Sequence, residues 1–237
     1  MKLLKIRHSI LTVAGLAALA ACSQKSPPIA STPPPPVVVV PPQPVPPSGA
    51  SANLVVPSVD ALGVRRTVNT GLSSAQATWN LRSAYNVAAL NCMQPEHAQI
   101  VVNYRAFLKA HTRRLAAVNK LVDDEFKGKF GPRFIAPREA YMTQVYNYFA
   151  LPPTLPAFCD AVLAMSNEAA GVSSAELESF AVRSLPNVEA VFLQFYRSYE
   201  QYRDDLSAWQ AKYMAPSATM PVALTLPPSP AQQPQAR

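Results

Sequence analysis

The sequence predicts an all-α fold, a bundle of five to six helices flanked by disordered Pro-rich N- and C-terminal tails. Apolar residues recur every three or four positions over long stretches, which is typical of helices that bury one face. Two capping-box patterns indicate helix starts, and no run alternates apolar and polar residues as a half-buried strand would. Because the Pro-rich composition ends near residue 58 and returns near residue 215, we expect the helical domain over residues 58–215 and a tail over residues 216–237.

The first predicted helix begins at a capping box, with Ser73 as the N-cap and Gln76 three residues later. Pro95 suits the first turn of a second helix, expected over residues 95–127. Seven residues of this helix follow the spacing of a bundle core, namely Val101, Tyr104, Leu108, His111, Leu115, Val118 and Val122. Before the first helix, residues 54–72 are ambiguous. Five apolar residues there are expected to pack as an extended arm, namely Val55, Val56, Val59, Leu62 and Val64.

Glycine and proline separate the remaining predicted helices. Residues 128–137 contain two of each and are expected to form a basic loop. A third helix is then expected over residues 138–150 and a fourth over residues 156–171. A second capping box at residues 173–176 indicates the start of a short fifth helix.

The last predicted helix, at about residues 187–214, carries a second long apolar seam. Its members are Val188, Phe192, Phe195, Tyr199, Tyr202, Leu206, Trp209 and Tyr213. Helical spacing favours core packing of these aromatic rings over a role as a sugar-stacking surface. Two long helices with matching seams are expected to pack antiparallel at about +20°.

The first 22 residues have the organisation of a bacterial export signal. Basic residues precede an apolar run at residues 10–21, which is shorter than the roughly 20 residues that span a bilayer. Leu19-Ala20-Ala21-Cys22 resembles the lipobox of bacterial lipoproteins. The resemblance implies that residues 1–21 are removed and that Cys22 receives three acyl chains, which would anchor the chain durably without a transmembrane helix. Serine rather than aspartate at position 23 implies, by likeness to enterobacterial lipoproteins, delivery to the outer membrane. An ordinary signal peptide with a chance cysteine is the alternative.

Residues 22–57 are expected to form a Pro-rich tether. Eleven of the 25 prolines lie within residues 26–48, where they prevent helix and sheet and favour polyproline II. The tether is either a spacer that lifts the domain from the membrane or a passive linker. Signal removal leaves 18 basic and 14 acidic residues, a net charge of +4. This weak charge and the envelope address argue against a nucleic-acid partner.

The other two cysteines, Cys92 and Cys159, are expected to form a structural disulfide, because the envelope is oxidising. His111 lies on the apolar seam and is expected in the core, whereas His97 is expected at the surface of a first helical turn. The sequence contains no zinc-ligand spacing, nucleophile motif or phosphate-binding loop. We therefore expect no metal, no cofactor and no enzymatic activity, with an envelope hydrolase as an alternative.

Basic residues form the main candidate binding surface. Arg105, Lys109 and Arg113 lie four residues apart on one helical face. Three more, Lys127, Lys129 and Arg133, follow in or beside the expected loop. This surface could meet lipid phosphates, lipopolysaccharide or an acidic partner. The alternative is a solvated face that pairs partly with Glu200, Asp204 and Asp205.

Two stretches carry a further resemblance. The first stretch, residues 79–92, begins with Trp79-Asn80-Leu81-Arg82 and ends with Asn91-Cys92. The second, residues 142–159, begins with Met142-Thr143-Gln144-Val145 and ends with Phe158-Cys159. Both stretches are similar to alphaproteobacterial envelope proteins of unknown function. The likeness covers about residues 73–170 and implies no activity. The order of lipid, stalk and domain is also similar to outer-membrane lipoproteins that activate peptidoglycan synthases.

These observations favour a non-enzymatic outer-membrane lipoprotein. Its membrane contact is expected through the lipid on Cys22. Its helical domain is expected to lie in the periplasm and to dock on an envelope protein or peptidoglycan. A peptidoglycan- or lipid-binding module is the second hypothesis.

Overall fold

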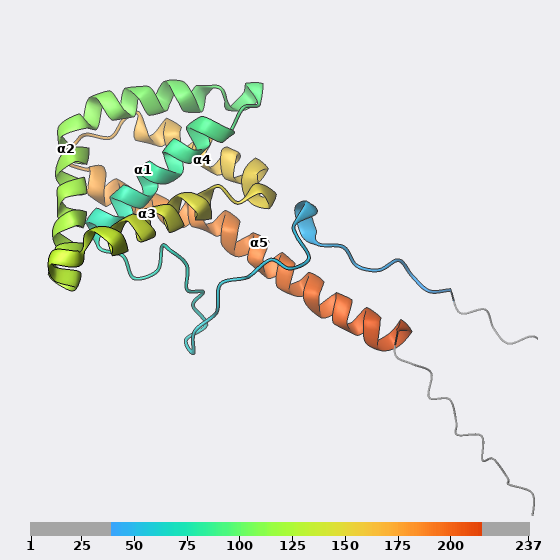
Figure 1. Ribbon diagram of the computed structural model, residues 1–237. Helices are drawn as coiled ribbons and strands as arrows, with labels where there is room; N and C mark the ends of the chain where they lie inside the picture. The colour runs from blue at the N-terminus through green and yellow to red at the C-terminus, as the bar shows by residue number, and fades with distance from the viewer. Residues whose placement is uncertain (1–38, 215–237) are drawn as a thin grey trace, which may run out of the picture. The chain divides into compact units, whose positions relative to one another are not determined.

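The computed structural model describes residues 39–214, in which five α-helices follow one another (Figure 1). Short 3₁₀ turns join the first four helices. The helices are α1 (Ser74–Asn91), α2 (Gln99–Phe130), α3 (Ile135–Phe149), α4 (Leu155–Ala169) and α5 (Leu177–Tyr213). Between residues 39 and 214 the one β-pairing is an isolated bridge of Val59 with Arg65. The all-α fold class is thereby confirmed. The expected signal peptide, Cys22 and the tail at 216–237 lie outside the described residues.

α1 is the central helix and packs against each of the other four (Figure 1). Its start is the predicted capping box, in which Ser73 Oγ accepts from the Gln76 amide at 3.0 Å and the Ser73 amide donates to Gln76 Oε1 at 3.2 Å. Leu81, Ala84 and Tyr85 are buried, and polar Asn80 is buried as well. Burial nearly all round explains why α1 lies inside the bundle rather than on its surface.

α2 follows the predicted seam but extends beyond its predicted end. Tyr104, His111, Val118 and Val122 are buried. The helix runs through Gly128 to Phe130 and ends at Gly131, whose φ of +61° favours glycine.

The prediction of a loop over residues 128–137 was therefore wrong. α3 already begins at Ile135, so Pro137 lies in its first turn, where a missing backbone N–H leaves no helical bond unmade. Because α2 and α3 follow each other so closely, the basic residues of this region lie mainly on helix surfaces.

The two last predicted helices are one helix. α5 spans 37 residues and passes through Pro186 without a break. Proline in a helix interior removes one backbone hydrogen bond and crowds the preceding turn. Here the neighbours Leu185 and Val188 are buried on either side of it, so core packing holds the helix through this position.

The expected antiparallel packing of α2 on α5 was also wrong. α1 lies between these two long helices, which share few contacts of their own (Figure 1). They meet near the start of α5, where Arg114 contacts Glu178 at 2.5 Å. The seam of each long helix thus packs mainly on α1 and on the shorter helices.

Contact with the bundle begins before residue 58, the expected domain boundary. Trp209 Nε1 donates to the carbonyl of Pro41 at 2.9 Å, and Tyr199 Oη donates to the carbonyl of Ser51 at 2.8 Å. Residues 41–57 therefore lie against α5. Of the five apolar residues expected to pack as an arm over residues 54–72, Val55 and Leu62 are each 87% exposed, so these two do not pack as expected.

Candidate binding groove

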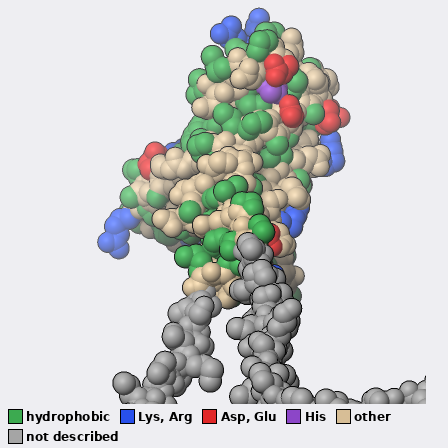
Figure 2. Space-filling model, turned by 90° about the vertical axis from the view of Figure 1, so that its right-hand side faces the viewer, with side chains coloured by type: hydrophobic (Ala, Val, Ile, Leu, Met, Phe, Trp, Pro, Cys, Tyr) green, Lys and Arg blue, Asp and Glu red, His purple; other side chains and the backbone are tan. Residues whose placement is uncertain are grey.

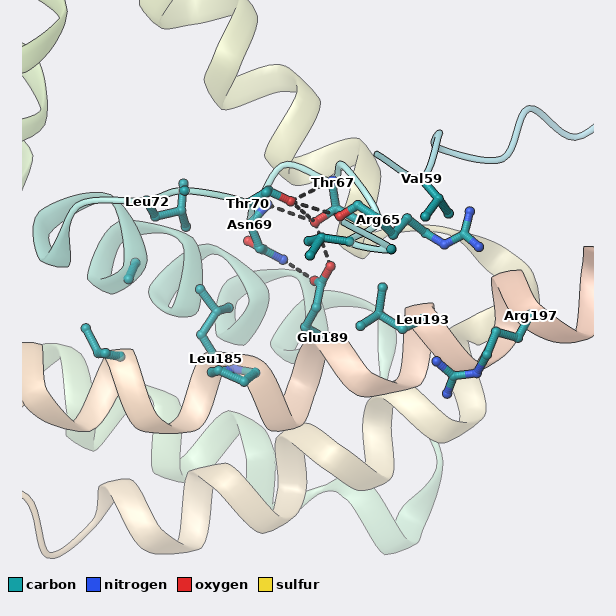
Figure 3. Close-up of a pocket in the computed structure, with 16 residues that line it drawn as sticks. Val59, Arg65, Thr67, Asn69, Thr70, Leu72, Leu185, Glu189, Leu193 and Arg197 are labelled. Carbon is teal, nitrogen blue, oxygen red and sulfur yellow. Dashed lines mark hydrogen bonds between the residues drawn. The ribbon is translucent and has the colours of Figure 1, made fainter. Parts of the chain in front are cut away.

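A groove of about 590 Å³ lies between the arm and the middle of α5 (Figure 3). The part of the arm from Val59 to Leu72 forms one wall, and one face of α5 forms the other. The α5 wall consists of Val182, Leu185, Pro186, Glu189, Leu193 and Arg197. Most of these side chains are aliphatic, and charged groups lie at the floor and at one end.

Local hydrogen bonds give the arm its shape. Asp60 Oδ1 accepts from the amides of Leu62 at 2.9 Å and Val64 at 3.0 Å, and Gly63 completes this turn with a φ of +80°. A second turn is closed by the Thr67 amide, which donates to Thr70 Oγ1 at 2.9 Å. The groove wall is therefore a pair of fixed turns.

Glu189 is the charged group at the floor of the groove, and it is only 8% exposed. Figure 3 shows its carboxylate directed toward Thr67 and Asn69 of the arm. Oε1 accepts from Thr67 Oγ1 at 2.7 Å and from Tyr148 Oη at 2.8 Å, while Oε2 accepts from the side-chain Nδ2 of Asn69. Burial and the nearby negative charge raise the pKa of Tyr148, so its hydroxyl stays a donor.

The same hydrogen-bond network continues into the core. Asn80 Nδ2, on α1, donates to Asn69 Oδ1 at 2.9 Å and to the Val68 carbonyl at 3.2 Å. Tyr141 Oη, on α3, donates to Asn80 Oδ1 at 2.6 Å. Each link from Tyr141 through Asn80 and Asn69 donates toward Glu189, so one carboxylate sets the direction of the whole chain of bonds. We call these residues, with Thr67 and Tyr148, the Glu189 network.

Two arginines lie at the same end of the groove (Figure 3). The side chain of Arg65 is only 8% exposed: it contacts Glu200 at 2.6 Å, donates to the Pro57 carbonyl at 2.5 Å and lies 5.6 Å from the centre of the Tyr196 ring. Arg197 is exposed and donates to Gln194 at 2.8 Å. Among residues 39–214, no carboxylate lies within 4.0 Å of Arg197. Arg65 is therefore neutralised, and Arg197 can receive an anionic group.

The polar side chains that line the groove are hydrogen-bonded largely to one another and to the backbone. The Glu189 oxygens already accept three hydrogen bonds, and the residues that line the groove include no histidine, cysteine, serine or lysine. Thr67 Oγ1, which donates to Glu189 Oε1 at 2.7 Å, is the one hydroxyl of this lining with a carboxylate beside it. In the described part of the chain, no group of three His, Cys, Asp or Glu side chains could hold a metal ion.

The structure does not bring the predicted basic residues to this groove. Arg105, Lys109 and Arg113 are exposed along α2, and Lys127, Lys129 and Arg133 are exposed near its C-terminal end. On the face shown in Figure 2, Lys and Arg side chains lie apart from one another at the edges.

The predicted partial pairing of these exposed basic residues with Glu200, Asp204 and Asp205 was wrong. Glu200 contacts Arg65, and Asp205 accepts from Gln201 at 2.8 Å. Both lie on the C-terminal half of α5, which α1 separates from most of α2.

Cys92 and Cys159 lie at disulfide distance, with their Cα atoms 5.6 Å apart, and join the end of α1 to α4. His111 is buried and contacts Ser174 Oγ at 2.9 Å, as expected for a core histidine. The surface position expected for His97 was wrong: it is 5% exposed, and its Nε2 lies 2.8 Å from Asp160 Oδ1. Asp160 directly follows Cys159, and His97 lies five residues after Cys92, so the contact between the two cysteines places Asp160 close to His97.

Sequence reasoning missed the Glu189 network entirely. Thr67, Asn69 and Glu189 come from segments about 120 residues apart, and no spacing pattern connects them. One signal was present: Glu189 directly follows Val188, the first residue of the α5 seam, so it lies beside a buried stripe where a carboxylate needs partners.

Within residues 39–214, no single helix is both long and apolar enough to cross a membrane, although α3 and α4 together, bent by 45°, pass the same test. Comparison of the chain with models of protein families, with curated proteins and with solved structures gives no match.

Proposed function

We propose that the chain is a non-enzymatic lipoprotein of the bacterial outer membrane whose helical domain binds an extended segment of an envelope protein in the groove between the arm and α5. One observation carries this proposal: the groove is open and largely aliphatic, its buried carboxylate already accepts three hydrogen bonds, and Arg197 lies exposed at one end without an acidic partner among residues 39–214. Such a surface offers both apolar and charged contacts to a ligand.

The anchor follows from the lipobox-like sequence before Cys22 and from the prolines after it. Among the described residues, the first hydrogen bond to α5 is made by Pro41, and we take residues 23–40 as the spacer. At about 3.1 Å per residue in polyproline II, these 18 residues reach about 56 Å. The spacer would keep the domain within this distance of the membrane and let it meet partners in the periplasm.

The lining favours a peptide over a glycan strand. No aromatic ring lines the groove, whereas sugar recognition commonly uses the face of an aromatic side chain. Val182, Leu185 and Leu193 offer contacts for aliphatic side chains, and Arg197 can bind a carboxylate. The proposed ligand is therefore an extended apolar segment with an aspartate or glutamate near one end.

The proposal can be tested by site-specific photocrosslinking in living cells. A photoreactive residue at Val182, which is 49% exposed and lines the groove, should capture one partner protein. Val102, on α2 and 58% exposed, is the matched control outside the groove. Arg197→Glu should abolish the Val182 product. The proposal fails if Val182 and Val102 capture the same proteins, or if Arg197→Glu leaves the product unchanged.

The anchor needs a separate experiment. Cys22→Ala should remove the lipid and release the exported chain into the soluble periplasmic fraction, whereas the parent stays with the outer membrane. Mass spectrometry of the parent should find acyl chains on Cys22. Retention of the Cys22→Ala chain in the outer membrane would contradict the lipid anchor and leave the groove proposal standing.

A further inference from the structure

A second cleft, of about 460 Å³, lies between α1 and α2 on a different part of the bundle from the arm. Its lining consists of Trp79 and Arg82 from α1 and Leu108, Thr112, Leu115, Ala116, Val118 and Asn119 from α2. Its size falls within the range of roughly 300–1,000 Å³ that is common for small-molecule sites. Neither the expected basic loop nor the Glu189 network contributes to it.

Arg82 is the one formally charged side chain in this lining. It is half-buried, and its guanidinium donates to Tyr146 Oη at 3.1 Å. Between residues 39 and 214, no carboxylate oxygen lies within 4.0 Å of it. The other partly buried arginines differ in this respect, because Arg65, Arg114 and Arg138 each contact a glutamate or aspartate.

Arg82 therefore lacks a carboxylate partner among residues 39–214. Its guanidinium carries five N–H donors in a planar fork that matches a carboxylate. A charge that is partly removed from water without an opposite charge is unfavourable, and a bound anion would relieve that cost. The geometry of Arg82 therefore suits a carboxylate that enters from the cleft.

The rest of the cleft is suited to an apolar chain. Leu108 and Leu115, two turns apart on α2, are partly exposed along it, and Val118 is buried at its base. The Trp79 ring is held edge-on against Tyr146, with ring centres 5.9 Å apart. Apolar side chains thus extend from the position of Arg82 along α2.

Basic residues border the cleft. Thr112 lines it and also lines the neighbouring hollow that contains Lys109 and Arg113, so these two exposed cations lie beside the cleft on α2. Their charges add to that of Arg82 and attract anions to this side of α2. Two residues of the basic surface predicted from the sequence, Lys109 and Arg113, therefore lie next to this cleft.

We propose that the cleft between α1 and α2 binds a free fatty acid of medium chain length, with its carboxylate on Arg82 and its acyl chain along Leu108 and Leu115. The carboxylate would accept two parallel hydrogen bonds from the guanidinium, and Trp79 would cover one side of the chain. This site is independent of the proposed peptide groove, because the two share no lining residue.

The test uses the whole chain with Cys22→Ala, so that no attached acyl chain competes, and with Trp209→Phe, which leaves Trp79 as its one tryptophan. Decanoate is titrated while Trp79 fluorescence is recorded, and calorimetry gives the affinity. We expect saturable binding of decanoate with one site per chain. Decanol and decyltrimethylammonium, which have the same chain length without the negative charge, should bind at least tenfold more weakly.

Three variants identify the site. Arg82→Gln should weaken decanoate binding at least tenfold, whereas Arg105→Gln, an exposed α2 position outside the cleft, should change it less than twofold. Ala116→Phe fills the cleft from an exposed position and should also abolish binding. If Arg82→Gln is unfolded by circular dichroism, Ala116→Phe decides. Equal affinity for the three amphiphiles, no saturable decanoate binding, or full binding by Ala116→Phe would overturn the proposal.

Discussion

Replacement of Glu189 by glutamine tests whether the Glu189 network holds the arm to the bundle. The carboxylate accepts hydrogen bonds from Thr67, Tyr148 and Asn69. Glutamine has nearly the same shape, but one of its two terminal atoms is a donor. Its oxygen can keep the bonds from Thr67 and Tyr148, and its NH₂ group then faces the NH₂ group of Asn69.

A flip of Asn69 does not relieve this conflict. Asn69 Oδ1 accepts from Asn80, and Asn80 Oδ1 in turn accepts from Tyr141, so a flip moves the donor–donor contact deeper into the core. The variant loses one charge-assisted hydrogen bond, of about 1.5–3 kcal/mol, and leaves a poorly solvated donor unpaired. We expect Glu189→Gln to lower the free energy of unfolding by about 3 kcal/mol.

Urea unfolding of the whole chain at pH 7 measures this change. With an m-value of about 2 kcal/mol/M, a loss of about 3 kcal/mol moves the midpoint by about 1.5 M. Glu139→Gln is the matched control, because Glu139 pairs with Arg138 but its side chain is 64% exposed, and its loss should change stability by less than about 0.5 kcal/mol. Equal midpoints for the two variants would refute the role given to the network.

Three further predictions concern stability. Replacing both Cys92 and Cys159 by alanine should lower the free energy of unfolding by about 4 kcal/mol, since the bond closes a loop of 67 residues; a loss below 1 kcal/mol would contradict this. Burial raises the pKa of Tyr141 and Tyr196 to about 12, so the unfolded chain loses these protons first. Stability should therefore fall between pH 10 and 12, by about 1.4 kcal/mol per pH unit for each group, and Tyr141→Phe should reduce that slope. Burial lowers the pKa of His111, so the unfolded chain binds this proton more readily, and stability should fall as the pH drops below about 6.5. His111→Gln should flatten that acid limb in urea titrations at pH 5–7.

Helices were predictable where the signal is local. A capping box and an apolar stripe depend on residues three or four apart, and Ser73, Gln76 and the α2 seam are observed as expected. Pro186 shows where this reasoning fails. Proline is a local helix breaker, but burial of Leu185 and Val188 outweighs that preference, and this packing depends on distant helices.

The site was not predictable for a related reason. Glu189 becomes recognisable only when Thr67 and Asn69 are placed against it, and their separation in the chain hides the contact. The burial of His97 was missed for the same reason. Its position two residues after a proline suggests a surface turn, and its partner Asp160 is 63 residues away in the sequence and close only in the folded chain. Hydrogen bonds between polar residues that are distant in the sequence produce no periodic pattern from which they could be predicted.

The Glu189 network and the proposed peptide groove share residues, which links stability to binding. Thr67 and Asn69 line the groove and also hold the arm to Glu189, so the arm is one wall only while the network is intact. Glu189→Gln should therefore weaken photocrosslinking from Val182 even under conditions in which the helices remain folded. Arg197→Glu should weaken the same crosslink without loss of stability, because Arg197 is exposed and has no acidic partner among residues 39–214. If Glu189→Gln lowers stability but leaves the crosslink intact, the partner binds to α5 alone and the arm is not part of its site.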